Sequence, residues 1–290
     1  YIFYSMFGFQ RVGDMIWSCG DMMCKGFLLG GTAGRTTLNG EGLQHQDGHS
    51  HILASTVPSL LSYDPAFGFE VAVIVREGMR RMYEEQEDIF YYLTLYNENH
   101  LMPDMAGVLA ASNQTQDALV QGILQGGYCF SRTSDAPAQI HLLSSGSIMQ
   151  QVMAAASQLE SMGFKVAIWS MTSFVELQRQ AMAVDRSNRD AAAKDQQMSN
   201  LEQMFAGATG ALVAVTDYMA SLALGIAAWM PEGYEVLGTD GFGLSESRPA
   251  LRAHFEVDTQ AIVRTSLTNL HKQALISDKA LSKHLRAITK

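Results

Sequence analysis

The chain has 290 residues, of which 47% are hydrophobic, and its formal net charge at pH 7 is −9. This length exceeds one average domain, and the apolar content is enough for two cores, so we expect two domains. Acidic and basic residues are interspersed, which excludes the clustered Lys and Arg surface that nucleic acid or an anionic membrane requires. Small molecules or other proteins are therefore the expected partners.

The cysteine pattern and the apolar segments indicate the compartment. Cys19, Cys24 and Cys129 are an odd number without a C-x-x-C pair, so neither a disulfide framework nor a zinc ribbon is predicted, and we expect a reducing cytoplasm. The most apolar helical candidate, 218–230, is shorter than the roughly 20 residues of a membrane span, and no signal-peptide pattern opens the chain. Because Tyr1 begins what resembles packed structure, we also expect residues upstream.

The first part of the chain alternates helical and extended patterns. Residues 7–17 carry apolar side chains at helical spacing, ending before Gly20. The stretch 30–51 follows, with many glycines and polar groups and almost no aliphatic residues. Residues 52–61 are apolar, but Pro58 leaves them ambiguous between a strand and a buried helix.

A helix and a strand are predicted next. Asp64-Pro65 is typical of an N-cap followed by proline at the first helical position, and apolar residues at helical spacing extend to Met82. Residues 89–95 predict a buried strand, so helix and strand alternate as in an α/β domain. The polar stretch 97–117 is the expected linker between two domains.

The second part predicts an α/β domain with a mostly parallel sheet. A strand, a helix and a second strand at 140–143, 148–162 and 165–171 form one βαβ unit, which implies parallel pairing. The polar, alanine-rich section 178–203 is helical by propensity without a strong apolar face and is interpreted as an excursion. Further strands are expected at 211–215 and 234–237, and helices at 218–230, from Ser247-Pro249, at 258–273 and at 278–288.

The stretch 30–51 is the first candidate for chemistry. His45, His49 and His51 are spaced H-x3-H-x-H, which on a helix would place the first two on one face as metal ligands. The neighbouring glycines argue against a helix, so we predict no metal site. A histidine beside Glu41 suits proton transfer, because imidazole both donates and accepts protons near neutral pH. The alternative is that these are loop histidines whose nitrogens bond to the backbone.

Two glycine-rich loops and an aromatic cluster leave alternatives open. Residues 30–37 resemble a phosphate-binding loop, but they lack the Gly-Lys-Ser/Thr ending and the G-x-G-x-x-G spacing, so nucleotide binding is not predicted. Residues 238–243 follow a predicted strand, where such turns occur with or without a ligand. The aromatic residues among positions 1–9 suit either stacking on a flat cofactor or a core, and their spacing favours a core.

Several motifs in the same order resemble one enzyme family. Together they closely resemble the E1 component of the bacterial homodimeric pyruvate dehydrogenase complex, from Tyr1 to about Thr265. GEGLQHQDGHSH is the most characteristic; the others are YSMFGFQR, SYDPAFGFEVAVI, TLYNEN, SSGSI, TSFVEL, TDYM, YEVLGTDGFGLSESR and HFEVD. The family is transketolase-like and depends on thiamine diphosphate. The resemblance implies that 1–105 are the later part of the middle, pyrimidine-binding domain and that 106–290 are a transketolase C-terminal-like domain.

The resemblance also assigns roles to individual residues. Phe7 matches the aromatic that packs on the aminopyrimidine ring, and Tyr4 and Arg11 match its neighbours in that pocket. Glu41 and His45 match polar residues lining the active-site channel, where the histidine is expected to assist at the substrate or the lipoyl acceptor. The implied function is decarboxylation of pyruvate and transfer of the acetyl unit to a lipoyl group. The cofactor supplies the nucleophile and electron sink, and the protein binds it and manages protons.

The resemblance further implies that this chain holds only part of the site. The glutamate that activates the pyrimidine nitrogen lies upstream of YSMFGFQR in the family, and the motif that holds Mg²⁺ and diphosphate belongs to a domain absent from this chain. We therefore expect the chain alone to be inactive, whether it is a truncation or one subunit of a split enzyme. The expected partners are the missing diphosphate-binding part or subunit, a homodimer or heterotetramer mate, and the lipoyl domain of an E2 or carrier protein.

Two alternatives to the pyruvate dehydrogenase hypothesis stay open. One is a subunit of a split thiamine-dependent, transketolase-like enzyme that delivers a two-carbon unit to a carrier protein in specialised metabolism. Departures from the family pattern in 178–203 keep it open. The other is a non-catalytic structural homologue, against which the retained Tyr4, Phe7, Glu41 and His45 argue.

Overall fold

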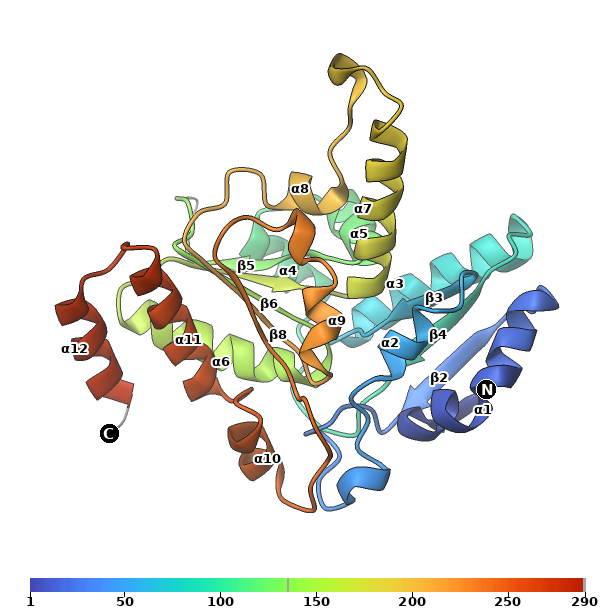
Figure 1. The fold of residues 1–290 in the computed structure, drawn as a ribbon, viewed down its shortest axis with the longest axis horizontal. Helices are drawn as coiled ribbons and strands as arrows, with labels where there is room; N and C mark the ends of the chain where they lie inside the picture. Colours follow the sequence, from blue (N-terminus) through green and yellow to red (C-terminus); the bar gives the residue numbers. More distant parts are fainter. Residues whose placement is uncertain (135, 289–290) are drawn as a thin grey trace.

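Two β-sheets organise the residues that the computed structural model describes, 1–134 and 136–288 (Figure 1). The first sheet is entirely parallel, with strand order β1-β2-β4-β3; its strands are β1 (Ile2–Tyr4), β2 (Phe27–Gly31), β3 (Leu60–Tyr63) and β4 (Phe90–Thr94). The second has the order β5-β7-β6-β8-β9; its strands are β5 (Tyr128–Arg132), β6 (Ile140–Ser144), β7 (Val166–Ser170), β8 (Ala211–Val215) and β9 (Tyr234–Leu237). Only β5 is antiparallel to its neighbour among these described strands, which confirms the predicted α/β class with a mostly parallel second sheet.

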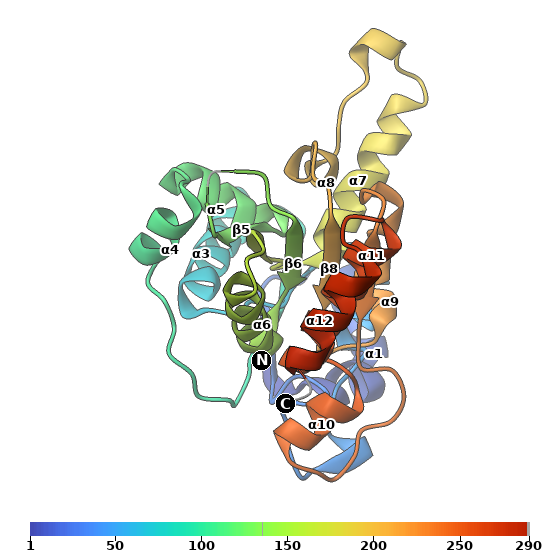
Figure 2. The ribbon, with the colours of Figure 1, turned by 90° about the vertical axis from the view of Figure 1, so that its left-hand side faces the viewer.

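Helices connect the strands and cover both sheets (Figures 1 and 2). The α-helices are α1 (Ser5–Asp21), α2 (Ser50–Ala54), α3 (Gly68–Met79), α4 (Met105–Ser112), α5 (Gln116–Gln125), α6 (Met149–Ser161), α7 (Phe174–Asn188), α8 (Asn200–Met204), α9 (Ala220–Leu224), α10 (Arg248–His254), α11 (Thr259–Lys272) and α12 (Asp278–Ile288). Short 3₁₀ turns lie at Gly42–Gln44, Gly146–Ile148, Ala193–Asp195 and Ala227–Trp229, and a π-helical turn at Arg80–Glu84. No helix in the described part of the chain is long and apolar enough to cross a membrane.

The second sheet is buried on both faces. Side chains along β8 alternate: Val213 packs in one apolar cluster with α6 and α11, while Leu212 packs in another with α7, α8 and α9. This alternation follows from the two-residue repeat of a strand. It explains why the sequence of β8, ALVAV, is uniformly apolar, as is typical of a parallel strand between two helical layers.

The start of α3 differs from its prediction. We expected Asp64 to be the N-cap and Pro65 the first helical residue, but the helix begins at Gly68 with Phe67 at the N-cap position. The side chain of Glu70 accepts hydrogen bonds from the backbone N–H groups of Ala66 and Phe67, at 2.6 and 2.9 Å. The Asp64 carboxylate has other partners in the interior, described below, and is not available as a cap.

The expected linker at 97–117 is also partly wrong, because it contains a helix. Asp104 caps α4 by accepting a hydrogen bond from the Gly107 N–H at 2.7 Å. Val108 is buried in the main apolar cluster, so α4 packs on the body of the molecule. The first sheet lies within 1–105 and the second within 106–290, while the exact domain boundary remains a prediction.

Two predicted helices have different bounds. The helix expected at 218–230 is replaced by α9 and a 3₁₀ turn, and Tyr218 precedes α9, where its ring is fully buried. The section 178–203 begins inside α7, whose first half has a buried face that includes Leu177 and Ala181. Residues 189–198 then project from the body, as Figure 1 shows. This apolar face begins at Phe174, so the section 178–203 by itself does not show it.

Candidate functional site

The carboxyl ends of the parallel strands of the two sheets meet, and backbone hydrogen bonds join the loops that follow these strands. The Asp64 N–H, after β3, donates to the Thr172 carbonyl at 2.8 Å, and the Arg35 N–H, after β2, donates to the Asp217 carbonyl at 3.0 Å. In open α/β sheets ligands bind outside the carboxyl ends of the strands. This junction is therefore the place where the fold favours a site.

Asp217, which follows β8, holds the glycine-rich stretch 30–51 in place. One carboxylate oxygen accepts from the backbone N–H and hydroxyl of Thr36 at 2.9 and 2.7 Å, and the other from the N–H and hydroxyl of Thr37 at 3.2 and 2.8 Å. Burial raises the pKa of Asp217 to about 6, against the opposing effect of these donors and of Arg252. The stretch 30–51 is thus held by polar contacts rather than by apolar packing.

His51 has a structural environment. Its Nδ1 lies 2.6 Å from the Ser62 hydroxyl and its Nε2 lies 2.9 Å from the Thr94 hydroxyl. Burial lowers its pKa, with smaller opposing effects of Asp64 and Asp47, so the ring is neutral near pH 7. Asp64 in turn accepts hydrogen bonds from Thr94, Tyr96 and Ser145. His51 thus holds strand ends together and is unavailable to a ligand.

The five residues singled out by the resemblance come together at the N-terminal end of α1. The His45 ring lies 4.8 Å from that of Phe7 and 5.6 Å from that of Tyr4, between ring centroids. The Arg11 guanidinium lies over Phe7, 4.0 Å from the ring centroid. His45 Nδ1 lies 3.0 Å from the Glu41 carboxylate.

A cavity of about 550 Å³ opens beside this group. Phe7 and Arg11 line it, whereas Tyr4, Glu41 and His45 adjoin it through the contacts just given. The other lining residues come from α1, the 30–51 stretch and the loops after β8 and β9: Met6, Gln10, Arg35, Leu43, Gln44, His49, Met219, Gly241 and Phe242. Apolar walls with a few polar groups are typical of a site for an organic ligand.

Sequence reasoning missed several of these residues. Gln10 lies one helical turn from Phe7, and its side chain amide lies 2.5 Å from His49 Nε2. Helical spacing from Phe7 could have indicated Gln10. Met219 and Phe242 lie far along the chain from the stretch 30–51. Of the two, only Phe242 lies in a stretch with a local pattern, the glycine-rich loop 238–243.

The three histidines of the 30–51 stretch do not converge. His51 is buried between strands, His49 faces Gln10, and His45 faces Glu41. Within 1–134 and 136–288 there is no group of three or more His, Cys, Asp or Glu side chains that could hold a metal ion. All three cysteines are free.

Comparison with known proteins agrees with this architecture. Residues 1–103 match the family described as the pyruvate dehydrogenase E1 component middle domain, and residues 126–258 match the transketolase-like C-terminal domain. A protein of Pseudomonas aeruginosa named pyruvate dehydrogenase E1 component is 47% identical over 285 residues. The chain is similar to the C-terminal part of the pyruvate dehydrogenase E1 component. It spans 31% of the length of that relative, and the match covers 97% of this chain.

Solved structures with the same fold include transketolases. The enzyme of Leishmania mexicana superposes with a TM-score of 0.66 at 16% identity, covering 93% of this chain and 34% of the other. A chain titled split gene transketolase, inactive beta4 tetramer, has a TM-score of 0.61 at 13% identity, covering 93% of this chain and 75% of the other. The predicted transketolase-like fold is confirmed.

Proposed function

We propose that this chain forms one wall of a thiamine diphosphate cleft in an enzyme that decarboxylates pyruvate and transfers the acetyl unit to a lipoyl group. The observation that carries the proposal is the convergence of Tyr4, Phe7, Arg11, Glu41 and His45 beside one cavity, of which Phe7 and Arg11 form part of the lining. Similarity to the pyruvate dehydrogenase E1 component supports the same reaction, and the chain spans 31% of that relative.

The residues present suit the pyrimidine half of the cofactor. Phe7 offers an aromatic face for a flat ring, and Met6 and Met219 add polarisable apolar walls. Arg11 covers one face of Phe7 and so fixes the ring's orientation. Thiamine diphosphate supplies a carbon nucleophile and an electron sink when bound. We assign Mg²⁺ and the diphosphate to a part of the enzyme outside this chain.

His45 and Glu41 are the proposed proton-handling pair. His45 Nδ1 faces the Glu41 carboxylate at 3.0 Å, so Glu41 orients the imidazole. Nε2 is then the atom that exchanges a proton with the substrate or the acyl acceptor. The His45 side chain is 22% exposed and Glu41 is 50% exposed, so the pair is accessible from the solvent side of the cavity. Tyr4 and Phe7 limit the movement of the imidazole.

The proposed partners follow from the missing wall of the cleft. They are the part or subunit that binds diphosphate, a second copy or heterotetramer mate, and a lipoyl domain of an E2 or carrier protein as acyl acceptor. Without the opposite wall we expect no turnover and no measurable cofactor binding by the chain alone. Cytoplasmic location remains a prediction from the cysteine pattern.

His45→Ala in the assembled enzyme tests the assignment. Loss of a positioned acid–base group lowers the rate roughly 10²–10⁴-fold. An exposed pair of this kind contributes at most about 1 kcal/mol to stability. We therefore expect acetylation of a lipoyl domain, followed by mass spectrometry, to fall at least 100-fold while the melting temperature changes little.

The matched control is His271→Ala, which removes another histidine that pairs with a carboxylate, Asp278, far along the chain. It should retain full acetyl transfer. An unfolded His45→Ala variant would show a structural histidine, and a folded variant with normal transfer would refute the assignment.

Two further measurements test the half-site proposal and the choice between this reaction and the split, transketolase-like alternative. Calorimetry of this chain with thiamine diphosphate should give no saturable heat, and saturable binding would contradict the half-site proposal. The assembled enzyme should accept pyruvate and acetylate a lipoyl domain. A preference for a ketose phosphate, or for a carrier thiol, would support the alternative instead.

A further inference from the structure

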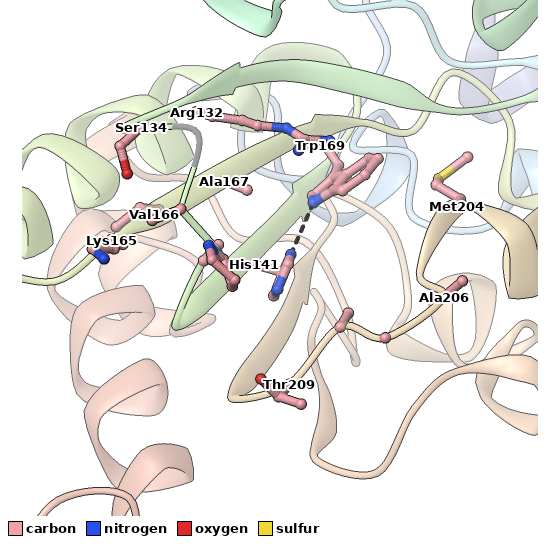
Figure 3. Close-up of a pocket in the computed structure, with 15 residues that line it drawn as sticks. Arg132, Ser134, His141, Lys165, Val166, Ala167, Trp169, Met204, Ala206 and Thr209 are labelled. Atoms are coloured by element: carbon pink, nitrogen blue, oxygen red, sulfur yellow. Dashed lines mark hydrogen bonds between the residues drawn. The ribbon is translucent and has the colours of Figure 1, made fainter.

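A second cavity, of about 280 Å³, lies at the opposite end of the second sheet from the candidate cleft. It opens where β6 and β7 begin, whereas the cleft lies beyond the carboxyl ends of the strands. Figure 3 shows Arg132, His141, Lys165 and Trp169 around it. Arg132, His141 and Trp169 lie on β5, β6 and β7, and Lys165 directly precedes β7, so the sheet positions these side chains. The candidate cleft uses none of them.

Two cations, Arg132 and Lys165, line this cavity. Neither forms an ion pair with any of the described residues, in a chain whose net charge is −9. Arg132 donates from Nε to the Cys129 Sγ at 3.2 Å, and its guanidinium lies 5.8 Å from the Trp169 ring. This leaves the terminal guanidinium nitrogens without a hydrogen-bond partner in the part of the chain that the structure describes.

A buried histidine supplies a third donor. His141 is 7% exposed, and its Nδ1 accepts a hydrogen bond from Trp169 Nε1 at 3.3 Å (Figure 3). Because Nδ1 is the acceptor, the ring proton belongs on Nε2. His141 Nε2 is buried and has no hydrogen-bond partner among the described residues. The Thr209 backbone is close enough to raise the pKa of His141 a little, but it makes no hydrogen bond of normal geometry with the ring. Burial, with Arg132, lowers the pKa of His141 to about 4, so the ring is a neutral donor.

We propose that this cavity binds a small organic anion that carries a carboxylate or phosphate on a flat group. The anionic group pairs with Arg132 and Lys165 and accepts from His141 Nε2–H, and the flat group lies against Trp169. An unpartnered buried N–H is costly, and an anion removes that cost. The volume is near the lower limit for ligand pockets, which restricts the ligand to a small molecule. This proposal does not depend on the proposed E1 reaction.

Calorimetry on the full polypeptide that contains these residues tests the proposal. The probes are benzoate and phenyl phosphate, with benzamide as the neutral analogue of the same shape. We expect one of the two anions to saturate at ~1 mM or below and benzamide not to bind, and the better anion identifies the preferred charged group. Quenching of tryptophan fluorescence by the anion, and its loss in a Trp169→Phe variant, locates the binding.

Charge-removing variants assign the binding to these side chains. Arg132→Gln and Lys165→Gln should each weaken binding roughly tenfold, because each removes a charge-assisted contact. Arg189→Gln, an exposed arginine on the projecting segment, is the matched control and should bind normally. Equal binding of benzamide, absence of saturation by either anion, or unchanged affinity in both glutamine variants would each overturn the proposal. If Arg132→Gln fails to fold, Lys165→Gln alone decides, because its side chain has no partner within the described residues.

Discussion

Glu70 is a buried carboxylate that joins α3 and the loop before it to the second sheet, and its replacement gives a sharp test of the polar interior. One oxygen accepts from the backbone N–H groups of Ala66 and Phe67 at 2.6 and 2.9 Å. The other accepts from the hydroxyls of Tyr128, on β5, and Ser170, on β7, at 2.7 and 2.6 Å. Four donors thus converge on a side chain with 0% exposure.

Glu70→Ala should be strongly destabilising, whereas Glu70→Gln should be nearly neutral. Alanine leaves four buried donors without an acceptor, which costs roughly 3–5 kcal/mol. Glutamine keeps its oxygen at the two backbone N–H groups. Its amide donates to the hydroxyls of Tyr128 and Ser170, which can rotate to accept. We expect a change in unfolding free energy within about 1 kcal/mol for glutamine.

The pH dependence sharpens this comparison. Burial raises the pKa of Glu70, although the four donors act in the opposite direction. A raised carboxyl pKa means that the folded state favours the protonated form, so this contribution to stability is greatest at low pH and is lost as pH rises through the folded pKa. Glutamine has no such loss. The stability of Glu70→Gln relative to the unsubstituted chain should therefore increase from pH 5 to pH 8.

Urea unfolding followed by far-ultraviolet circular dichroism measures these differences, with Glu84→Ala, at an exposed position, as the control. Equal destabilisation by glutamine and alanine would refute the reasoning, because it would show that the interior requires the negative charge.

Three further predictions concern stability. Burial lowers the pKa of His141 from 6.5 to about 4, so the folded state disfavours the protonated ring. The free energy of unfolding should therefore be greatest above pH 6.5 and decrease by about 3 kcal/mol as the pH falls to 4. Urea titrations of His141→Gln should not show this decrease. Arg179 donates hydrogen bonds to three backbone carbonyls within residues 55–60. Thermal unfolding should show that Arg179→Met lowers the stability by about 2 kcal/mol. The control Arg186→Met, at an exposed position later in α7, should change the stability little. Gly34 has φ +91°, and a Cβ at this position would overlap the Asp217 carboxylate. Calorimetry should therefore show that Gly34→Ala lowers the stability of the fold by at least about 2 kcal/mol. An equally stable variant would show that the loop can move away from Asp217.

Local patterns predicted most regular elements. The strands at 211–215 and 234–237 and the helix at 278–288 were predicted with the observed bounds. Strong apolar runs between turns leave few alternatives there. The start of α3 was predicted wrongly because the sequence around Asp64 has the local pattern of an N-cap. In the structure, the Asp64 carboxylate instead accepts hydrogen bonds from Thr94, Tyr96 and Ser145. β1, β2 and β5 were missed because their short sequences carry no distinct period.

The candidate site was predictable only in part. Spacing singled out the stretch 30–51, and the family resemblance named five residues within or beside it. Neither gave the pairing of Gln10 with His49, the approach of Phe242, or the burial of His51. These depend on contacts between residues far apart in the chain, for which a single sequence carries no local signal.

The α/β class, the order of most helices and strands, and the glycine-rich polar stretch follow from the sequence, because they depend on periodicity and turn chemistry among neighbouring residues. How that stretch is held depends on tertiary contacts. It has too few aliphatic side chains to be fixed by burial, and Asp217, about 180 residues away in the chain, holds Thr36 and Thr37 by four hydrogen bonds. Buried polar groups require partners, and only the meeting of the two sheets determines which residues supply them.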